Sequence, residues 1–185
     1  MMGSRRLRRT TISSAAGELR ITRATMADYD AVMRILREAA DWLTSRGNPQ
    51  WEHWYLEVGE SILRQQIEEH EVYLAALDTR SITTVTVQWS DTMVWGAKGA
   101  DGLAGYIHGL AISRSVAGLR VGERMLEWAI GLIAARGRRY ARLDCLASNV
   151  ALCRYYNDRG FTAMGTAMPL RHYTCRLFER EIKDF

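Results

Sequence analysis

The residues from Gly118 to Gly122 have the types and spacing of an anion-binding turn. Apolar residues recur at helical spacing from Gly122 to Ile133, and this pattern predicts a helix over Gly118–Arg136. The first turn of a helix carries unpaired backbone N–H groups and the positive end of the helix dipole, and a glycine there leaves room for a phosphate. A glycine at a helix start can also be only a cap, so the turn by itself predicts an anion site without identifying the ligand.

A tyrosine pair on a second predicted helix, Asn149–Arg159, offers proton chemistry. Asn149, or the serine before it, can cap the helix, and Gly160 suits its end. Tyr155 is expected to pack in the core, which is also the simplest role for any buried tyrosine. The hydroxyl of Tyr156, directed from this helix toward a neighbouring groove, can instead act as a general acid.

His108 is a third group with proton chemistry. It lies in a predicted strand, Gly105–Ile112, where the two-residue period places it on one face with Tyr106, Leu110 and Ile112. Histidine exchanges protons readily near neutral pH, so His108 can accept a proton from an attacking amine. A structural role for His108, with the proton lost directly to water, is the alternative.

Alternating elements must position these groups. The predicted strands are Leu19–Ala24, Glu71–Leu77, Ser81–Trp89, Gly105–Ile112, Arg139–Ala147, Phe161–Ala167 and His172–Glu179. A capping box at Thr25 and Asp28 predicts the start of the first helix, and Asp91–Gly102 is expected to be an exposed loop. An antiparallel front followed by a parallel crossover predicts an α/β fold, with a mixed central sheet and helices on both faces.

Two of these segments resemble the motifs of one family, the GCN5-related N-acetyltransferases (GNAT family). Leu110-Ala111-Ile112, a short arm and Ala117-Gly118-Leu119-Arg120-Val121-Gly122 are similar to the family's coenzyme A motif, a strand ending L-A-V and then Q/R-x-x-G-x-G/A. Ala117 and Arg120 depart from that motif. Asn149–Phe161 fits the family pattern N-x-x-A-x-x-F/Y-Y-x-x-x-G-F more closely. The resemblance extends from Leu19 to Glu179.

The resemblance implies the GNAT fold, with acetyl-CoA as co-substrate and acetyl transfer to the primary amine of a small molecule by direct attack. The cofactor-binding residues that it implies are Leu110, Ala111, Ile112, Ala117, Gly118, Leu119, Arg120, Val121, Gly122, Asn149 and Tyr156. It gives Tyr156 the task of protonating the departing thiolate, and the arylalkylamine branch of the family has a histidine at the place of His108. A larger acyl or aminoacyl donor such as charged tRNA, and a non-catalytic acyl-CoA-binding module, are the alternatives.

The charge pattern bears on partners and domain boundaries. The chain has 25 basic and 21 acidic residues among its 185, and Arg5, Arg6, Arg8 and Arg9 account for the whole net charge of +4. We therefore expect a basic, disordered tail over residues 1–17 and one folded domain over residues 18–185. Because the excess charge is not on the folded body, the pattern argues against a nucleic-acid-binding face.

The cysteines and the apolar segments bear on location. Cys145, Cys153 and Cys175 are odd in number and have no C-x-x-C spacing, which favours neither disulfides nor a metal site and predicts a reducing, cytoplasmic environment. No apolar stretch is long enough to cross a membrane. Exposed strand edges in such sheets often pair, so a homodimer is one expectation.

An unusual set of aromatic residues bears on the acceptor: Trp42, Trp51, Trp54, Tyr55, Trp89 and Trp95. Core packing is their simplest role. By the family resemblance, the acceptor lies between these elements and the cofactor strand. An aromatic-walled pocket is therefore expected there, with Glu52 or Asp91 attracting an ammonium group.

Overall fold

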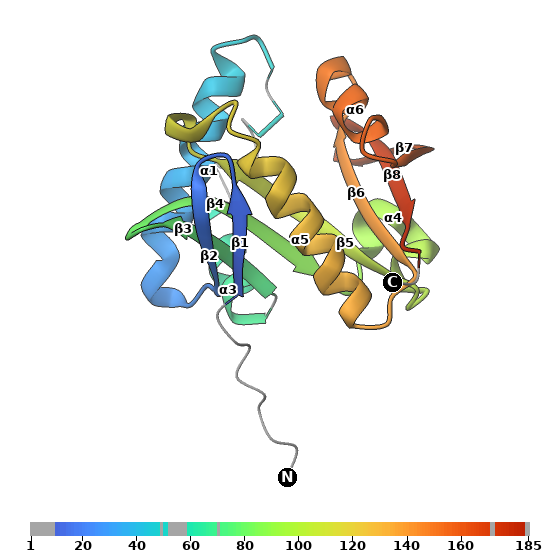
Figure 1. The fold of residues 1–185 in the computed structure, drawn as a ribbon. Helices are drawn as coiled ribbons and strands as arrows, with labels where there is room; N and C mark the ends of the chain where they lie inside the picture. Colours follow the sequence, from blue (N-terminus) through green and yellow to red (C-terminus); the bar gives the residue numbers. More distant parts are fainter. Residues whose placement is uncertain (1–9, 49, 52–58, 70, 171–172, 184–185) are drawn as a thin grey trace.

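The computed structural model describes residues 10–48, 50–51, 59–69, 71–170 and 173–183. Its centre is an eight-stranded sheet with the order β1-β2-β3-β4-β5-β6-β8-β7 (Figure 1). Strands β5 and β6 are parallel, and every other neighbouring pair is antiparallel. The predicted mixed sheet is confirmed.

The elements follow the predicted order, with additions. The strands β1 to β8 are Thr10–Ser14, Gly17–Arg23, Glu71–Leu77, Arg80–Gln88, Ala104–Ile112, Tyr140–Leu146, Thr162–Leu170 and Tyr173–Glu181. The α-helices are α1 Tyr29–Thr44, α3 Gly59–Glu69, α4 Thr92–Trp95, α5 Val121–Ala135 and α6 Val150–Asn157, and three short 3-10 helices are η1 Met26–Asp28, η2 Gly96–Ala100 and η3 Arg114–Val116. The capping box before α1 is present, because the N–H group of Thr25 donates to Oδ2 of Asp28 at 2.9 Å.

The alternation of β3 shows that helices cover both faces of the sheet. Tyr73 and Ala75 belong to the core beneath α5, whereas Val72 and Leu74 pack with α1 and α3. Because successive residues of a strand face opposite sides, α5 lies on the face opposite to α1 and α3. Figure 1 shows α5 crossing the sheet, with β1 to β4 on one side of it and β6, β8 and β7 on the other.

The parallel pair β5 and β6 separates partway along its length. Its paired register ends at Ile107 and Leu143, after which β6 continues beside β8 as far as Leu146. The next residues on the two separating strands are His108 and Asp144. The sheet therefore opens at the point where both strands carry a polar side chain.

A bulge in β5 overturns the predicted side-chain pattern of this strand. Gly109 has a φ of +56°, in the left-handed region that favours glycine, and the register with β4 shifts between Thr84 and Thr86. Before the bulge, His108 shares a face with Tyr106. After it, Leu110 and Ile112 pack into the core on the side of α5. The prediction that these four residues share one face was wrong, because the extra residue reverses the alternation.

Two further expectations are corrected. Thr10–Ser14 pairs with β2 as a hairpin, so the part of the predicted tail from residue 10 onward is an ordered edge of the sheet, and residues 1–9 lie outside the described residues. Asp91–Gly102 is not an exposed loop, because it contains α4 and η2 and buries Trp95 and Gly99. Within the described ranges, the helices are too short or too polar to cross a membrane.

Candidate active site

The predicted anion turn lies before α5, which begins at Val121 and not at Gly118. Gly118 and Arg120 both have left-handed backbone, with φ of +81° and +57°. The N–H groups of Ala117 and Leu119 are used within the turn, and the first intrahelical bond joins the N–H of Arg124 to the carbonyl of Arg120 at 3.1 Å. The N–H groups at the start of α5, from Val121 to residue 123, therefore have no carbonyl one turn earlier and can receive an anion.

Arg120 is at the position where the family motif has glycine, and its side chain is bound by Glu123 of α5. Its Nε and a terminal nitrogen donate to the Glu123 carboxylate at 2.9 and 2.6 Å. Arg159 also donates to that carboxylate, at 3.2 Å. The hydrogen bond from Arg120 is the main cause that lowers the pKa of Glu123 to about 2. The guanidinium is thus bound to Glu123 on α5. The groups of the turn that remain to bind an anion are backbone N–H groups.

The strand end facing the turn is Leu110-Ala111-Ile112. The Ala111 carbonyl accepts a hydrogen bond from Oγ1 of Thr83 at 2.8 Å, which fixes the strand after its bulge. A Cβ atom added to Gly122 would lie 3.6 Å from Cγ2 of Ile112, so glycine keeps a gap between the helix start and the strand end. A narrow, amide-lined gap of this kind suits an extended phosphate-bearing cofactor.

Asn149 acts as the cap of α6. Its Oδ1 accepts from the N–H of Leu152 at 3.1 Å, and its Nδ2 donates to Oε1 of the buried Gln50 at 3.1 Å. The side chain thereby joins α6 to the segment that follows α1. Its predicted contact with the cofactor stays a prediction.

Tyr156 is buried and lines a cavity that is continuous with the strand end. Its ring packs against Phe161 and Phe178, with centroids 5.9 and 5.6 Å apart. Burial raises the pKa of Tyr156 above its usual range, so the hydroxyl keeps its proton at neutral pH. This protonation state is the one that an acid needs. Tyr155 packs under the Arg159 guanidinium, 3.5 Å from the ring centroid.

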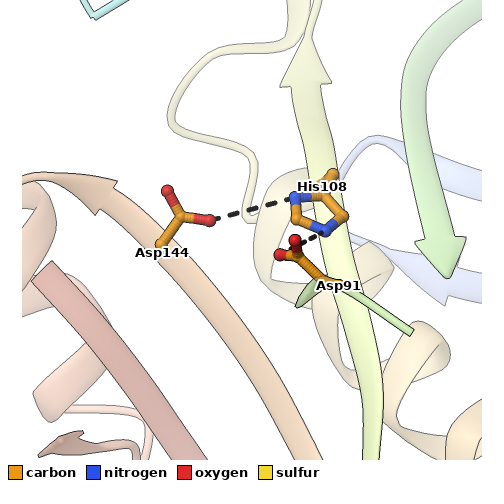
Figure 2. A group of neighbouring side chains, drawn as sticks. All are labelled: Asp91, His108 and Asp144. Atoms are coloured by element: carbon orange, nitrogen blue, oxygen red, sulfur yellow. Dashed lines mark ion pairs between the residues drawn. The ribbon is translucent and has the colours of Figure 1, made fainter. Parts of the chain in front are cut away.

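His108 lies between two carboxylates (Figure 2). Its Nε2 is 3.5 Å from Oδ2 of Asp91, and its Nδ1 is 3.9 Å from Oδ1 of Asp144. The three side chains are 23%, 7% and 14% exposed for His108, Asp91 and Asp144. Both distances exceed those of a normal hydrogen bond. Among the described residues, Nε2 of His108 and Oδ2 of Asp91 are buried without a hydrogen-bond partner.

The arrangement suits proton transfer better than it suits one metal ion. The three side chains are close enough for metal ligands, but Figure 2 shows each carboxylate at a different ring nitrogen. The two nitrogens of imidazole point in divergent directions, and each lies nearest a different carboxylate. Both nitrogens can instead carry a proton shared with a carboxylate. The cluster can therefore accept a proton and stabilise the resulting imidazolium.

Burial sets the ionisation of Asp144. Desolvation raises the pKa of Asp144 and the Asp91 charge adds to the rise, while His108 and a contact with the Cys175 thiol oppose it. A carboxylate in this environment gains from a nearby cation. A cation bound beside Asp144 would offset the free-energy cost of burying the ionised carboxylate.

Sequence reasoning named Asp91 only as one of two acids that could attract an ammonium, and it missed Asp144. Glu52, the other acid, lies outside the described residues, as do Trp54 and Tyr55. A signal for Asp144 was present, because β6 alternates buried apolar residues with Arg142 and Asp144 on the other face. Pairing Asp144 with His108 requires the register of β5 and β6, which a single strand pattern does not contain.

A buried arginine holds Asp91 in place from β6. Arg142 donates to the Lys98 carbonyl at 2.7 Å, to the Tyr106 hydroxyl at 2.8 Å and to Oδ2 of Asp101 at 2.8 Å. These bonds fasten the segment with α4 and η2 to the sheet. Asp91 begins this segment and caps α4, since its Oδ1 accepts from the N–H of Val94 at 3.1 Å.

One cavity of about 680 Å³ joins these groups. Ile112, Gly122 and Tyr156 line the part of the cavity next to the predicted anion turn, which we call the donor end. The cavity wall also includes the three side chains of the His108 cluster and apolar residues of α1 and α3, namely Leu36, Ala39, Trp42, Leu43, Ile62 and Leu63. The site can therefore hold two reactants at once, with proton-transfer groups between them.

Comparison with known proteins identifies the class of protein. The model of the acetyltransferase (GNAT) family matches residues 32–161, so the chain belongs to that family and is an acyltransferase. It is 32% identical over 166 residues to the uncharacterized N-acetyltransferase YesJ of Bacillus subtilis (strain 168), covering 86% of this chain and 88% of the relative.

Solved structures share the fold. A GNAT-family acetyltransferase from Listeria monocytogenes superposes with a TM-score of 0.78 at 24% identity, over 94% of this chain and all of that one (100%). The PaiA N-acetyltransferase of Thermoplasma acidophilum, solved in complex with coenzyme A, superposes with a TM-score of 0.70 at 15% identity, over 89% and 99% of the two chains. The predicted GNAT fold is confirmed.

Proposed function

We propose that the protein is an acetyl-CoA-dependent N-acetyltransferase that acetylates the primary amine of a small molecule by direct attack within a ternary complex. The observation that carries this proposal is the single cavity shared by the anion-binding turn, Tyr156 and His108. Two reactants that meet in one cavity can react without a covalent enzyme intermediate. The related PaiA structure with coenzyme A supports the choice of donor.

The donor would be held mainly by backbone groups. The free N–H groups of Val121 and Gly122 suit the pyrophosphate, with Gly118 giving the turn its left-handed conformation. Leu110, Ala111 and Ile112 would lie along the acyl-bearing arm, where an amide left unpaired at the separated strand end can polarise the thioester carbonyl. The pairing of β5 with β6 ends at Ile107, and this supports an unpaired amide on the side of the strand end that faces away from β4.

Two proton transfers complete the reaction. The amine must be neutral to attack, and His108 would accept its proton with Asp91 and Asp144 stabilising the imidazolium. The new bond joins the amine nitrogen to the acetyl carbon, and the carbon–sulfur bond breaks. Tyr156 would donate a hydrogen bond and then its proton to the departing sulfur, and would regain a proton from solvent.

The departure at Arg120 does not call for a larger donor, because its side chain is engaged by Glu123. None of the described contacts favours charged tRNA over coenzyme A. The three cysteines are free thiols, which agrees with a proposed cytoplasmic location, where acetyl-CoA is available.

The proposal is tested by thiol release from acetyl-CoA in the presence of a panel of primary amines. Before the assay, saturating acetyl-CoA should raise the melting temperature, because a ligand that binds only the native state stabilises it. Absence of this shift would rule out the coenzyme A donor. A Tyr156→Phe variant should keep the shift and lose about 10²-fold or more in kcat, as expected for loss of a general acid. Unchanged kcat in that variant would remove Tyr156 from the mechanism.

A further inference from the structure

The part of the cavity lined by Asp91, His108 and Asp144, which we call the acceptor end, has an unbalanced charge. Asp91 and Asp144 form ion pairs only with His108 among the described residues, and neither pairs with a lysine or an arginine. With both carboxylates ionised, the cluster carries two negative charges when His108 is neutral and one when His108 is protonated. Buried carboxylates are normally paired, because an unpaired charge away from water costs several kcal/mol. The cluster therefore lacks about one positive charge.

A group of suitable charge can reach the cluster from the cavity. All three side chains line the cavity, and Oδ2 of Asp91 is buried without a hydrogen-bond partner. The Asp91 backbone is fixed, since its N–H donates to the Gly99 carbonyl at 2.9 Å and a Cβ atom at Gly99 would collide with the Asp91 carbonyl. The carboxylate is thus held ready for a donor that comes with the ligand. An ammonium group supplies both the missing charge and the missing donor.

Apart from Asp91 and Asp144, the described lining residues offer no counter-charge to a second cation. The described residues that line the cavity include no acid besides Asp91 and Asp144. The polar residues elsewhere in the lining are mainly neutral amides, among them Gln65, Gln66 and Gln88, together with one cation, Arg114. The Arg114 guanidinium lies 4.0 Å from the centroid of the Trp42 ring, at the α1 side of the cavity. A second ammonium on the acceptor would lose its hydration in this part and would face a like charge.

We infer that the acceptor is a primary amine with a single positive charge and an apolar body, whose ammonium binds Asp91 and Asp144 beside His108. This inference rests on the proposed acetyl transfer and adds the class of substrate. The apolar body packs against the α1 and α3 walls, which Leu36, Leu43 and Leu63 represent. The further cations of diamines, polyamines and aminoglycosides have no counter-charge among the described lining residues, so we expect these amines to be poorer acceptors.

The test uses two acceptors of equal length that differ only in the second charge, hexylamine and 1,6-diaminohexane. With acetyl-CoA saturating, kcat/KM for hexylamine should exceed that for the diamine by about tenfold or more, the factor expected when one ammonium is desolvated without a partner. Phenethylamine should behave like hexylamine. A preference for the diamine would overturn the inference and leave the proposed acetyl transfer intact.

Matched variants test whether Asp91 and Asp144 bind the ammonium group of the acceptor. Asp91→Asn and Asp144→Asn should each raise the KM for hexylamine by about 30-fold or more, because each removes one partner of a buried charge pair. Both variants should keep the wild-type KM for acetyl-CoA. Glu68→Gln removes an exposed acid on α3, and it should leave both constants unchanged. An unchanged amine KM in the Asp91 and Asp144 variants would refute the binding role of the carboxylates.

A direct binding measurement keeps the inference separate from the proposed function. With coenzyme A bound, hexylamine should raise the melting temperature of the wild-type protein but not that of Asp91→Asn. If no amine is turned over, this shift still supports a cation-binding site at Asp91 and Asp144. In that case only the proposed acetyl transfer fails. If hexylamine gives no shift in the wild-type protein, the inference fails.

Discussion

The donor and acceptor ends of the cavity are built from different parts of the chain. The donor end uses two local segments, the turn before α5 and the helix α6, and its contacts come largely from backbone groups and a cap. The acceptor end brings together Asp91, His108 and Asp144, three side chains from separate elements. Local structure therefore suffices for a donor site, whereas the acceptor site depends on the register of the sheet. This division suits enzymes that share one donor and differ in acceptor.

The largest effect is expected from removing the acceptor-end base. His108→Ala should lower kcat/KM by about 10²- to 10⁴-fold, the usual contribution of a positioned general base. The acetyl-CoA thermal shift should be retained, since the donor end does not use this side chain. Thiol-release kinetics measure the first quantity and a melting curve the second. A loss of less than about threefold would mean that water accepts the proton directly.

The next effect is on stability. It tests whether Arg142, which fastens the segment that begins with Asp91 to the sheet, stabilises the fold. Arg142→Met should lower the free energy of unfolding by about 3–5 kcal/mol, because it removes a buried guanidinium and leaves the partly buried Asp101 and Glu179 carboxylates without their partner. Arg142 is 2% exposed, and its Nε donates to Oε2 of Glu179 at 2.7 Å. Urea denaturation measures the change.

Arg139→Met is the matched control, because the pair of Arg139 with Glu181 is largely exposed, at 63% and 55% for the two side chains. This variant should change the free energy of unfolding by less than about 1 kcal/mol. Equal effects from the two variants would contradict the supporting role of Arg142.

A smaller effect separates stability from activity at Asp144. Asp144→Asn should raise the free energy of unfolding at neutral pH by about 0.5–2 kcal/mol, as is common when an unfavourable functional group is removed. Burial raises the pKa of Asp144 in the folded protein, so its ionised form destabilises the fold at pH values above that pKa. The cost fades as the pH falls through the folded pKa toward the unfolded value. The gain from the variant should therefore be largest near neutrality and should shrink on acidification.

Urea denaturation at several pH values checks this dependence. Asp158→Asn removes an exposed acid at the end of α6 and should change the free energy of unfolding by no more than about 0.5 kcal/mol. A gain for Asp144→Asn that grew on acidification would have the wrong sign for a buried, unpaired carboxylate.

The same division explains what the sequence could predict. Local patterns predict the capping box at Thr25 and Asp28, the apolar face of α5 from Gly122 to Ile133 and the mixed sheet. The structure has all three. The bulge at Gly109 could not be read from the strand pattern, because one extra residue is defined only by pairing with β4. The order of residues 91–102 was also missed, because α4 is a single turn that depends on burial of Trp95 and on bonds from Arg142.

The smallest effect concerns Arg120, one of the two residues that depart from the family's coenzyme A motif. Arg120→Gly relieves a left-handed backbone that disfavours side chains, but it gives the unfolded chain more freedom and removes an exposed ion pair with Glu123. These contributions oppose one another, so the free energy of unfolding should change by less than about 1 kcal/mol. The KM for acetyl-CoA should stay within about threefold of the wild-type value, because backbone amides bind the anion.

Arg120→Ala completes this test, since it removes the guanidinium and keeps the left-handed strain. A rise of about tenfold in the acetyl-CoA KM in both variants would show that the guanidinium itself binds a phosphate. A fall of similar size in both would show that the arginine obstructs the turn. An unchanged acetyl-CoA KM in both variants would leave the backbone amides as the groups that bind the anion. Donor binding would then tolerate a side-chain change at Arg120, whereas amine binding is expected not to tolerate one at Asp91 or Asp144.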